Sequence, residues 1–177
     1  MRYLIWTALL LSCGTFAGQQ NFQLSRKQCE VVVKKQFPDF HIMREDDFPK
    51  MYRGRFRDGK SGSLVFGHFY SKDQLDFAAF LIGPRKNEYS YESAIVICRS
   101  NGNNRYACST LSDGPHYSEE DDVISLVPSG TYSCIEGEHS TSSIEIHLDA
   151  VGWASEKAGE IYLPKANGSF ERCITSD

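Results

Sequence analysis

The residues of this chain that could do chemistry gather in one polar segment in the second half of the sequence. A histidine and a tyrosine are followed, one residue later, by four consecutive acids; the candidate binding residues are His116, Tyr117, Glu119, Glu120, Asp121 and Asp122. The composition of this segment favours a long loop over residues 112–122, and such loops on rigid scaffolds often carry binding. An acidic loop would contact a basic surface of a partner. A solvated connection that binds nothing is the alternative reading.

A second group of polar side chains alternates along a predicted strand. Glu145, His147 and Asp149 share one face of residues 143–150, opposite three apolar residues. They could contribute to a metal site or to a small hydrolase, but neighbours on one strand face lie about 6–7 Å apart. An exposed strand face explains them equally well. We therefore assign no metal ligand, no cofactor and no catalytic residue.

Known catalytic motifs do not occur in the sequence. It contains no G-x-S-x-G, H-E-x-x-H or C-x-x-C motif and no glycine-rich phosphate loop. Arg53, Arg55 and Arg57 alternate along another predicted strand, where they could contact phosphate or protect a sheet edge. Few aromatic residues accompany them, so we do not expect nucleic-acid binding.

The N-terminus predicts export. A cationic start, an apolar run from Tyr3 to Leu11 and small residues before position 18 are typical of a signal peptide over residues 1–17. Alternatively, Leu10 to Gly14 resembles the lipobox of bacterial lipoproteins, with residues 1–12 removed and Cys13 lipidated. We expect a periplasmic or extracellular protein, or a lipoprotein anchored to the membrane. Residues 18–177 then form a single globular domain.

Charge is distributed unevenly along the chain. The net charge of the 177 residues is −4, but residues 1–60 carry 11 basic against 6 acidic residues, and the remainder carries 8 against 17. An acidic surface disfavours nucleic acid and anionic lipid and favours a basic partner. Solvated surface without a partner explains the asymmetry as well.

The pattern of apolar residues and turns predicts an α+β fold. Ser25 and Gln28 form a capping-box pattern at the start of a helix that ends at Phe37, before Pro38. Short strands separated by turn residues follow, at 51–57, 63–70, 75–82, 89–99, 105–111, 123–127, 143–150, 160–163 and 169–174. We expect the helix to pack on a mainly antiparallel sheet with meander topology, stabilised by disulfides.

Five cysteines remain beyond Cys13, so one must stay free or pair with another chain in a disulfide-linked dimer. Cys98 and Cys108 lie at mirrored positions about a turn at Asn103, which favours a disulfide between adjacent strands. Cys134 and Cys173 would then form the second disulfide. Cys29 falls on the apolar face of the helix and is the first choice for the free thiol. Other pairings remain open at this point.

One segment carries a weak resemblance to a known family. Gly67, Asp76, Phe77 and Ala78 match the frame of the calcium loop in FG-GAP and VCBS-type repeats. His68, Tyr70 and Lys72 stand where that loop has acidic ligands, so the resemblance implies no calcium site. It extends loosely to the C-terminal strands of small exported bacterial proteins of unassigned function, and it implies an α+β architecture rather than an activity.

Together these observations favour an exported, non-enzymatic protein-binding module of the cell envelope, of the inhibitor or immunity type. An envelope-anchored accessory lipoprotein is the alternative, and a small hydrolase is a third.

Overall fold

The computed structural model describes residues 24–47, 61–102, 105–117, 122–136, 140–155 and 159–176. Helix α1 (Arg26–Gln36) begins as the sequence predicts. The Ser25 side chain accepts from the backbone N–H of Gln28, and the Gln28 side chain accepts in return from the backbone N–H of Ser25. The last helical residue is Gln36, and Phe37, the residue before Pro38, is the C-cap. Its buried face carries Cys29 and Val33.

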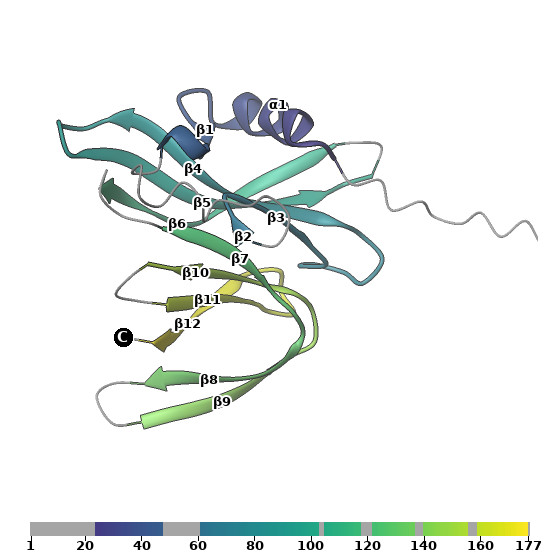
Figure 1. The fold of residues 1–177 in the computed structure, drawn as a ribbon. Helices are drawn as coiled ribbons and strands as arrows, with labels where there is room; N and C mark the ends of the chain where they lie inside the picture. Colours follow the sequence, from purple (N-terminus) through teal and green to yellow (C-terminus); the bar gives the residue numbers. More distant parts are fainter. Residues whose placement is uncertain are drawn as a thin grey trace, which may run out of the picture.

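Within the described ranges, the strands form two five-stranded antiparallel sheets and one separate hairpin (Figure 1). The first sheet contains β1 (His41–Ile42), β3 (Leu64–Gly67), β4 (Asp76–Arg85), β5 (Ser90–Ser100) and β6 (Tyr106–Tyr117). The second sheet has the order β12 (Phe170–Ser176), β11 (Gly159–Pro164), β10 (Ala150–Ala154), β7 (Val123–Val127) and β2 (Ser61–Gly62). The hairpin consists of β8 (Gly130–Glu136) and β9 (Ser140–Ile146). A short 3-10 helix, η1 (Glu45–Asp47), follows β1.

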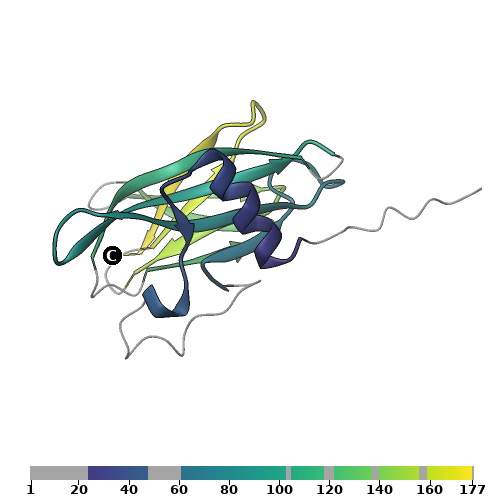
Figure 2. The same ribbon diagram turned by 90° about the horizontal axis from the view of Figure 1, so that it is seen from above.

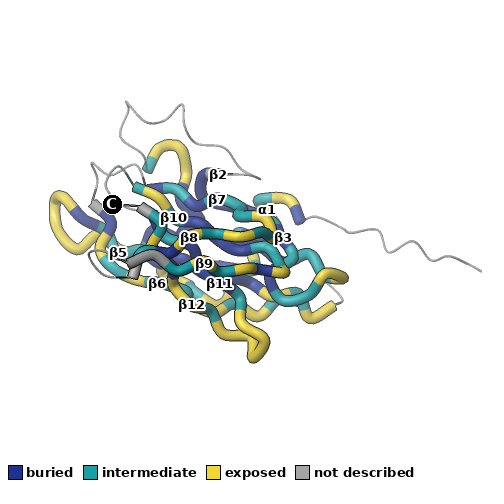
Figure 3. Tube along the Cα trace, turned by 90° about the horizontal axis from the view of Figure 1, so that it is seen from below, coloured by how far each residue is buried: buried dark blue, intermediate teal, exposed yellow. Residues whose placement is uncertain are grey.

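The elements stack as four layers, with a hydrophobic core between each neighbouring pair. Helix α1 covers the outer face of the first sheet (Figure 2), and the β8–β9 hairpin covers the outer face of the second sheet (Figure 3). Strand β4 is buried on both faces because alternate residues point to opposite sides. Phe77, Ala79 and Leu81 join the core under the helix, whereas Ala78 and Phe80 join the core between the sheets.

A bend in two neighbouring strands creates the fourth layer. Strands β7 and β10 pair up to Val127 and Ala150, and the same two chain segments continue as β8 and β9 after the bend. Asp149 fixes the bend to the loop between β3 and β4: its carboxylate accepts from the His68 backbone N–H at 2.8 Å, and its own N–H donates to the His68 carbonyl oxygen at 3.2 Å.

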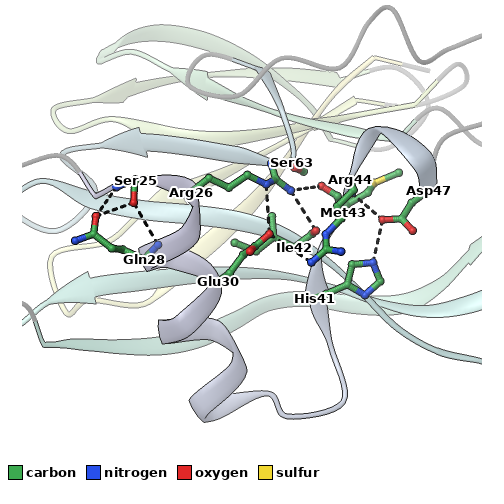
Figure 4. A network of polar contacts seen from close by, with 10 residues as sticks. All are labelled: Ser25, Arg26, Gln28, Glu30, His41, Ile42, Met43, Arg44, Asp47 and Ser63. Carbon is green, nitrogen blue, oxygen red and sulfur yellow. Dashed lines mark hydrogen bonds and ion pairs between the residues drawn. The ribbon is translucent and has the colours of Figure 1, made fainter.

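A polar network fixes α1 to the first sheet (Figure 4). The Arg26 guanidinium donates to the carbonyl oxygens of Ile42 and Met43 at 3.2 and 2.7 Å, and it pairs with Glu30 on the next helical turn. Asp47 stands at the far end of this network. Burial alone would raise the pKa of its carboxyl, but hydrogen bonds from His41 and the Arg44 backbone outweigh that effect, so the pKa of Asp47 is lowered.

Both predicted disulfides are present. Cys98 and Cys108 are directly opposite each other on β5 and β6, and Cys134 on β8 is joined to Cys173 on β12. Cys29 is a buried thiol on the inner face of the helix and takes part in neither of these disulfides. Both bonds are intramolecular, and disulfides of this kind are typical of proteins exported to an oxidising compartment. No helix among the described residues is long and apolar enough to cross a membrane.

Several predicted elements need correction. The protein is mainly β with an N-terminal helix, so the α+β description holds only loosely, and the meander is confined to two runs of consecutive strands, β3 to β6 and β10 to β12. Residues 112–117 are not a loop but the second half of β6, because strand β5 is long enough to pair with them. The predicted strand 143–150 is interrupted by the bend, and β8 was not predicted. The predicted strand at 51–57, with its three arginines, lies outside the described residues.

Candidate functional site

The C-terminal half of β6 and three strands of the second sheet enclose a small cavity, which we call the acidic pocket. Its volume is about 190 Å³, and its acidic lining residues are Asp113, Asp122 and Glu160. Trp153 and Tyr162 contribute aromatic walls. The pocket exists because β6 is an edge strand: beyond it the first sheet ends, while the second sheet continues below through β11 and β12.

Asp122 is the most deeply buried acid of the pocket, with 5% of its surface exposed. Its Oδ2 atom lies 2.9 Å from Nδ1 of His116, which is itself 1% exposed and packs edge-on against the Phe80 ring. This contact joins the end of β6 to the start of β7, and so connects the two sheets. The other carboxylate oxygen, Oδ1, is buried and has no hydrogen-bond partner among the described residues.

Glu160, Tyr162 and Arg172 form the opposite wall. The Tyr162 hydroxyl donates to Glu160 Oε2 at 3.0 Å, and Arg172 Nη2 lies 2.9 Å from Glu160 Oε1. The Glu160 side chain is 12% exposed and that of Arg172 60%, so the acid lies inside the pocket and the arginine at its rim. Burial, with the adjacent Glu160 charge, raises the pKa of Tyr162 to about 12, although a hydrogen bond with Ser112 opposes the shift.

Two larger cavities follow the acidic pocket in series, and only the first of them adjoins it. One, of about 400 Å³, shares Ser112, Tyr162 and Arg172 with it, and the next, of about 380 Å³, shares Tyr70 and Gly168 with that one. Together the three cavities form what we call the side groove, which follows β6 on one side and the β11–β12 turn on the other.

Tyr70 and Arg99 organise the middle of the side groove. The guanidinium of Arg99 lies over the Tyr70 ring, 5.1 Å from its centre, and Phe170 packs edge-on against the same ring at 5.5 Å. Burial raises the pKa of Tyr70, and the nearby Asp76 charge adds to this effect.

The predicted binding residues have different positions from those expected. His116 and Asp122 are buried rather than displayed on a loop, because residue 116 belongs to β6 and the pair lies between the sheets. Asp122 nevertheless lines the acidic pocket. The backbone of Tyr117 ends β6, while Glu119, Glu120 and Asp121 lie outside the described residues, as does Cys13.

The other predicted groups do not assemble into a site. Glu145 and His147 are largely exposed, with 3.9 Å between His147 Nδ1 and Glu145 Oε1, whereas Asp149 turns away to bind the His68 backbone. The described ranges contain no cluster of three metal-ligating side chains. In the segment that resembles a calcium loop, Asp76 is fully buried and accepts from the backbone N–H groups of Tyr70 and Ser100.

Glu160, Tyr162 and Arg172 were missed in the sequence. The alternation along β11 was a usable signal, because Glu160 and Tyr162 fall on one face while Ile161 and Leu163 fall on the other. A polar pair opposite an apolar pair indicates two different environments. It does not show that the polar face lies beneath β6.

Comparison with known proteins adds no relative: no family model, no curated protein and no solved structure matches this chain.

Proposed function

We propose that this protein is an exported, non-enzymatic protein-binding module, of the inhibitor or immunity type, that holds a basic partner protein in its side groove. The observation that carries the proposal is a series of three cavities, each sharing lining residues with the next, along one side of the molecule. A groove of this extent can accept a segment of a partner rather than a single small molecule.

The walls of the side groove are already ordered in the protein, which favours a preformed binding surface. One wall consists of consecutive β6 residues, Ser109 to Ser112, and the other of the turn between β11 and β12. Strand β6 is held by its long pairing with β5 and by the Cys98–Cys108 disulfide. Little backbone ordering is therefore required on binding, which favours affinity.

The charge of the chain supports a basic partner. Its net charge is −4, and the excess of acidic residues lies in the part that builds the groove. Three acidic residues, Asp113, Asp122 and Glu160, belong to the acidic pocket at one end of the groove. Complementary charge steers association and raises its rate.

The proposal includes two possible forms of the exported protein. One is secreted to the periplasm or the medium, and the other is anchored to the membrane by a lipid at Cys13. Intact mass of the purified protein separates the two forms of processing. A chain that begins after residue 17 without lipid is expected for the secreted module, and a lipidated chain that begins at Cys13 is expected for the accessory lipoprotein.

The test of binding is partner capture with a blocked groove. Ser109 lines the groove, is exposed and lies opposite Ile97 of the core between the sheets, so Ser109→Trp should fill it; Ala107 is exposed on the same strand but lines none of the three cavities, so Ala107→Trp is the matched control. We expect envelope and medium fractions to yield one stoichiometric basic protein on the wild type and on Ala107→Trp, and none on Ser109→Trp. Equal retention by both variants, or no retention at all, would refute the proposal.

A further inference from the structure

We infer that the cavity of about 380 Å³ at one end of the side groove binds a carboxylate of the partner protein through the Arg99 guanidinium. We call it the arginine cavity; Tyr70, Lys165 and Asn167 also line it. The acidic pocket lies at the other end of the groove, so a bound segment would have a defined direction. This inference rests on the proposed function, because it names a group of the partner that the side groove would recognise.

Arg99 is placed at the cavity by the alternation of side chains along β5. Ile95 and Ile97 belong to the core between the sheets, so Arg99 continues the same face at the end of the strand. Its guanidinium lies over the Tyr70 ring, 5.1 Å from the ring centre, and Phe170 packs edge-on against that ring. Stacking of this kind orients the guanidinium before a ligand arrives, which reduces the entropy lost on binding.

The N–H donors of Arg99 are available to a ligand. Arg85 also lies over a tyrosine ring, but its guanidinium donates to the carbonyl oxygens of Asn87 and Glu88. Arg99 makes no hydrogen bond and no ion pair with any residue that the structure describes. Asp76 acts on it only through space: burial raises the pKa of the Asp76 carboxyl and the Arg99 charge opposes the shift, while both carboxylate oxygens accept from backbone N–H groups. The planar fork of guanidinium donors matches the two oxygens of a carboxylate.

The turn between β11 and β12 supplies a second donor. Asn167 is exposed and lines the arginine cavity, and its side-chain oxygen accepts from the N–H and the hydroxyl of Ser169 at 3.0 and 2.7 Å. These two bonds fix the amide, whose nitrogen donates to no residue in the described part of the chain. Gly168 brings the turn close to Tyr70, because a Cβ atom on it would lie 4.0 Å from Cε1 of the ring. Oriented donors from two elements favour a ligand that accepts hydrogen bonds.

The other charged residues of the lining leave one positive charge without an acidic partner. Lys165 is paired with Glu171 at 3.0 Å. Glu145 Oε1 lies 3.9 Å from His147 Nδ1, and both side chains are largely exposed. Among the described residues of the lining, Arg99 is therefore the cation that a single carboxylate would balance. A volume of about 380 Å³ has room for the side chain or chain end that carries it.

The test uses small probes and needs no knowledge of the partner. Backbone NMR shifts of the full protein are followed during titration with Nα-acetyl-glutamic acid α-amide, which has a side-chain carboxylate, and with Nα-acetyl-alanine, which has a chain-end carboxylate. Nα-acetyl-glutaminamide and Nα-acetyl-alaninamide are the uncharged controls. We expect saturable shifts at Tyr70, Arg99 and Gly168 with at least one carboxylate, which identifies the source of the group, and none with the amides. No saturable shift with either carboxylate, equal shifts with the amides, or tighter binding of inorganic phosphate would overturn the inference.

Substitutions of Arg99 locate the site. The residue is exposed, so its variants are expected to fold. Arg99→Gln should weaken binding of the carboxylate by roughly tenfold or more, as expected when hydrogen bonds between charged groups are lost. Arg99→Lys keeps the charge but not the planar fork and should weaken binding less. Arg105→Gln removes an exposed arginine from the neighbouring β5–β6 turn, which lines none of the three cavities, and is the matched control.

Two outcomes of this series would also overturn the inference. One is unchanged binding by Arg99→Gln. The other is an equal loss in Arg99→Gln and Arg105→Gln, because the probe would then respond to overall charge and not to the cavity.

The two proposals fail separately. A partner that is retained equally by the wild type and by Arg99→Gln would leave the binding module standing and remove the carboxylate site. A carboxylate probe that binds at Arg99, when no partner protein is retained, would leave the site and remove the protein-binding function.

Discussion

Two buried aspartates in this protein have opposite hydrogen-bond surroundings. Asp76 accepts from backbone N–H groups with both oxygens, from Tyr70 at 3.2 Å and from Ser100 at 2.8 Å. Asp122 uses one oxygen to contact His116 and keeps the other without a partner in the described part of the chain. The carboxylate of Asp76, with both oxygens satisfied by backbone N–H groups, therefore has a structural role in the first sheet.

Asp76→Ala should therefore destabilise the fold without changing the acidic pocket. The variant leaves the Tyr70 and Ser100 N–H groups without their acceptor, at an expected loss of about 3 kcal/mol in free energy of unfolding. Urea unfolding measures the loss. Asp73→Ala, which removes an exposed acid from the same loop, is the control and should change stability by less than about 0.5 kcal/mol. An equal loss in both variants would contradict the structural role of Asp76.

Tyr162 should be among the last tyrosines to ionise. Its pKa is raised to about 12, chiefly by burial, from an ordinary value of 10.0. Since the folded pKa is the higher one, the folded state holds this proton more tightly than the unfolded state. The corresponding stabilisation is complete below pH 10 and is lost as the pH rises towards 12. An ultraviolet titration of tyrosinate checks the value: Tyr162→Phe should remove a transition near pH 12, and the removal of one near pH 10 would contradict it.

At the scale of elements, the helix protects an edge of the first sheet. Strand β6 ends that sheet, and unpaired strand edges favour aggregation. Gln36, in the last turn of α1, covers two outward-facing backbone groups: its amide oxygen accepts from the Cys108 N–H at 2.9 Å, and its amide nitrogen donates to the Tyr106 carbonyl oxygen at 3.3 Å. Pro115 has no N–H to offer at the other end of β6.

Gln36→Ala should expose this part of the edge. We expect a loss of about 1 kcal/mol in free energy of unfolding for the missing hydrogen bonds, together with self-association that increases with concentration. Chemical unfolding and light scattering after gel filtration measure the two effects. Lys35→Ala changes the neighbouring exposed residue and should have neither effect. A monomeric Gln36→Ala protein of unchanged stability would show that the edge needs no cover.

At the scale of the whole molecule, four layers are joined by few covalent links. The Cys134–Cys173 disulfide connects the β8–β9 hairpin to β12 and thereby holds the fourth layer on the second sheet. The Cys98–Cys108 disulfide lies within the first sheet and joins no layers. Their sequence separations are 39 and 10 residues, so the first restricts the unfolded chain more strongly.

Removal of the Cys134–Cys173 disulfide should loosen one layer selectively. The double variant Cys134→Ala/Cys173→Ala is expected to lose about 4 kcal/mol in free energy of unfolding by the loop-entropy estimate. Hydrogen exchange should increase first in β8 and β9, because the core beneath them is the smallest of the three. The matched variant Cys98→Ala/Cys108→Ala should leave exchange in β8 and β9 unchanged. A uniform increase across all layers would contradict the layered description.

The parts of this fold that depend on residues close together in the sequence could be predicted from the sequence. The capping box of α1 involves residues three apart, and the β5–β6 hairpin brings Cys98 opposite Cys108 through one turn. Segment 112–117 was misread because its glycine, proline and acids resemble a loop, although pairing with β5 holds it as a strand. The bend that separates β7 from β8 was not predicted from the sequence. Strand β8 is held by its pairing with β9, and this pairing cannot be recognised from the residues of β8 alone.

By itself, the sequence determined the helix, most strands and the acidic character of the second half of the chain, and it favoured the disulfide pairing that the structure shows, since capping, alternation and turn chemistry act over a few residues. Only the tertiary structure decided which strands share a sheet, that His116 and Asp122 are buried, and that Asp122 and Glu160 line one pocket. The physical reason is that alternation tells which residues share a face of a strand, whereas the partner of that face is selected by packing between residues far apart in the chain.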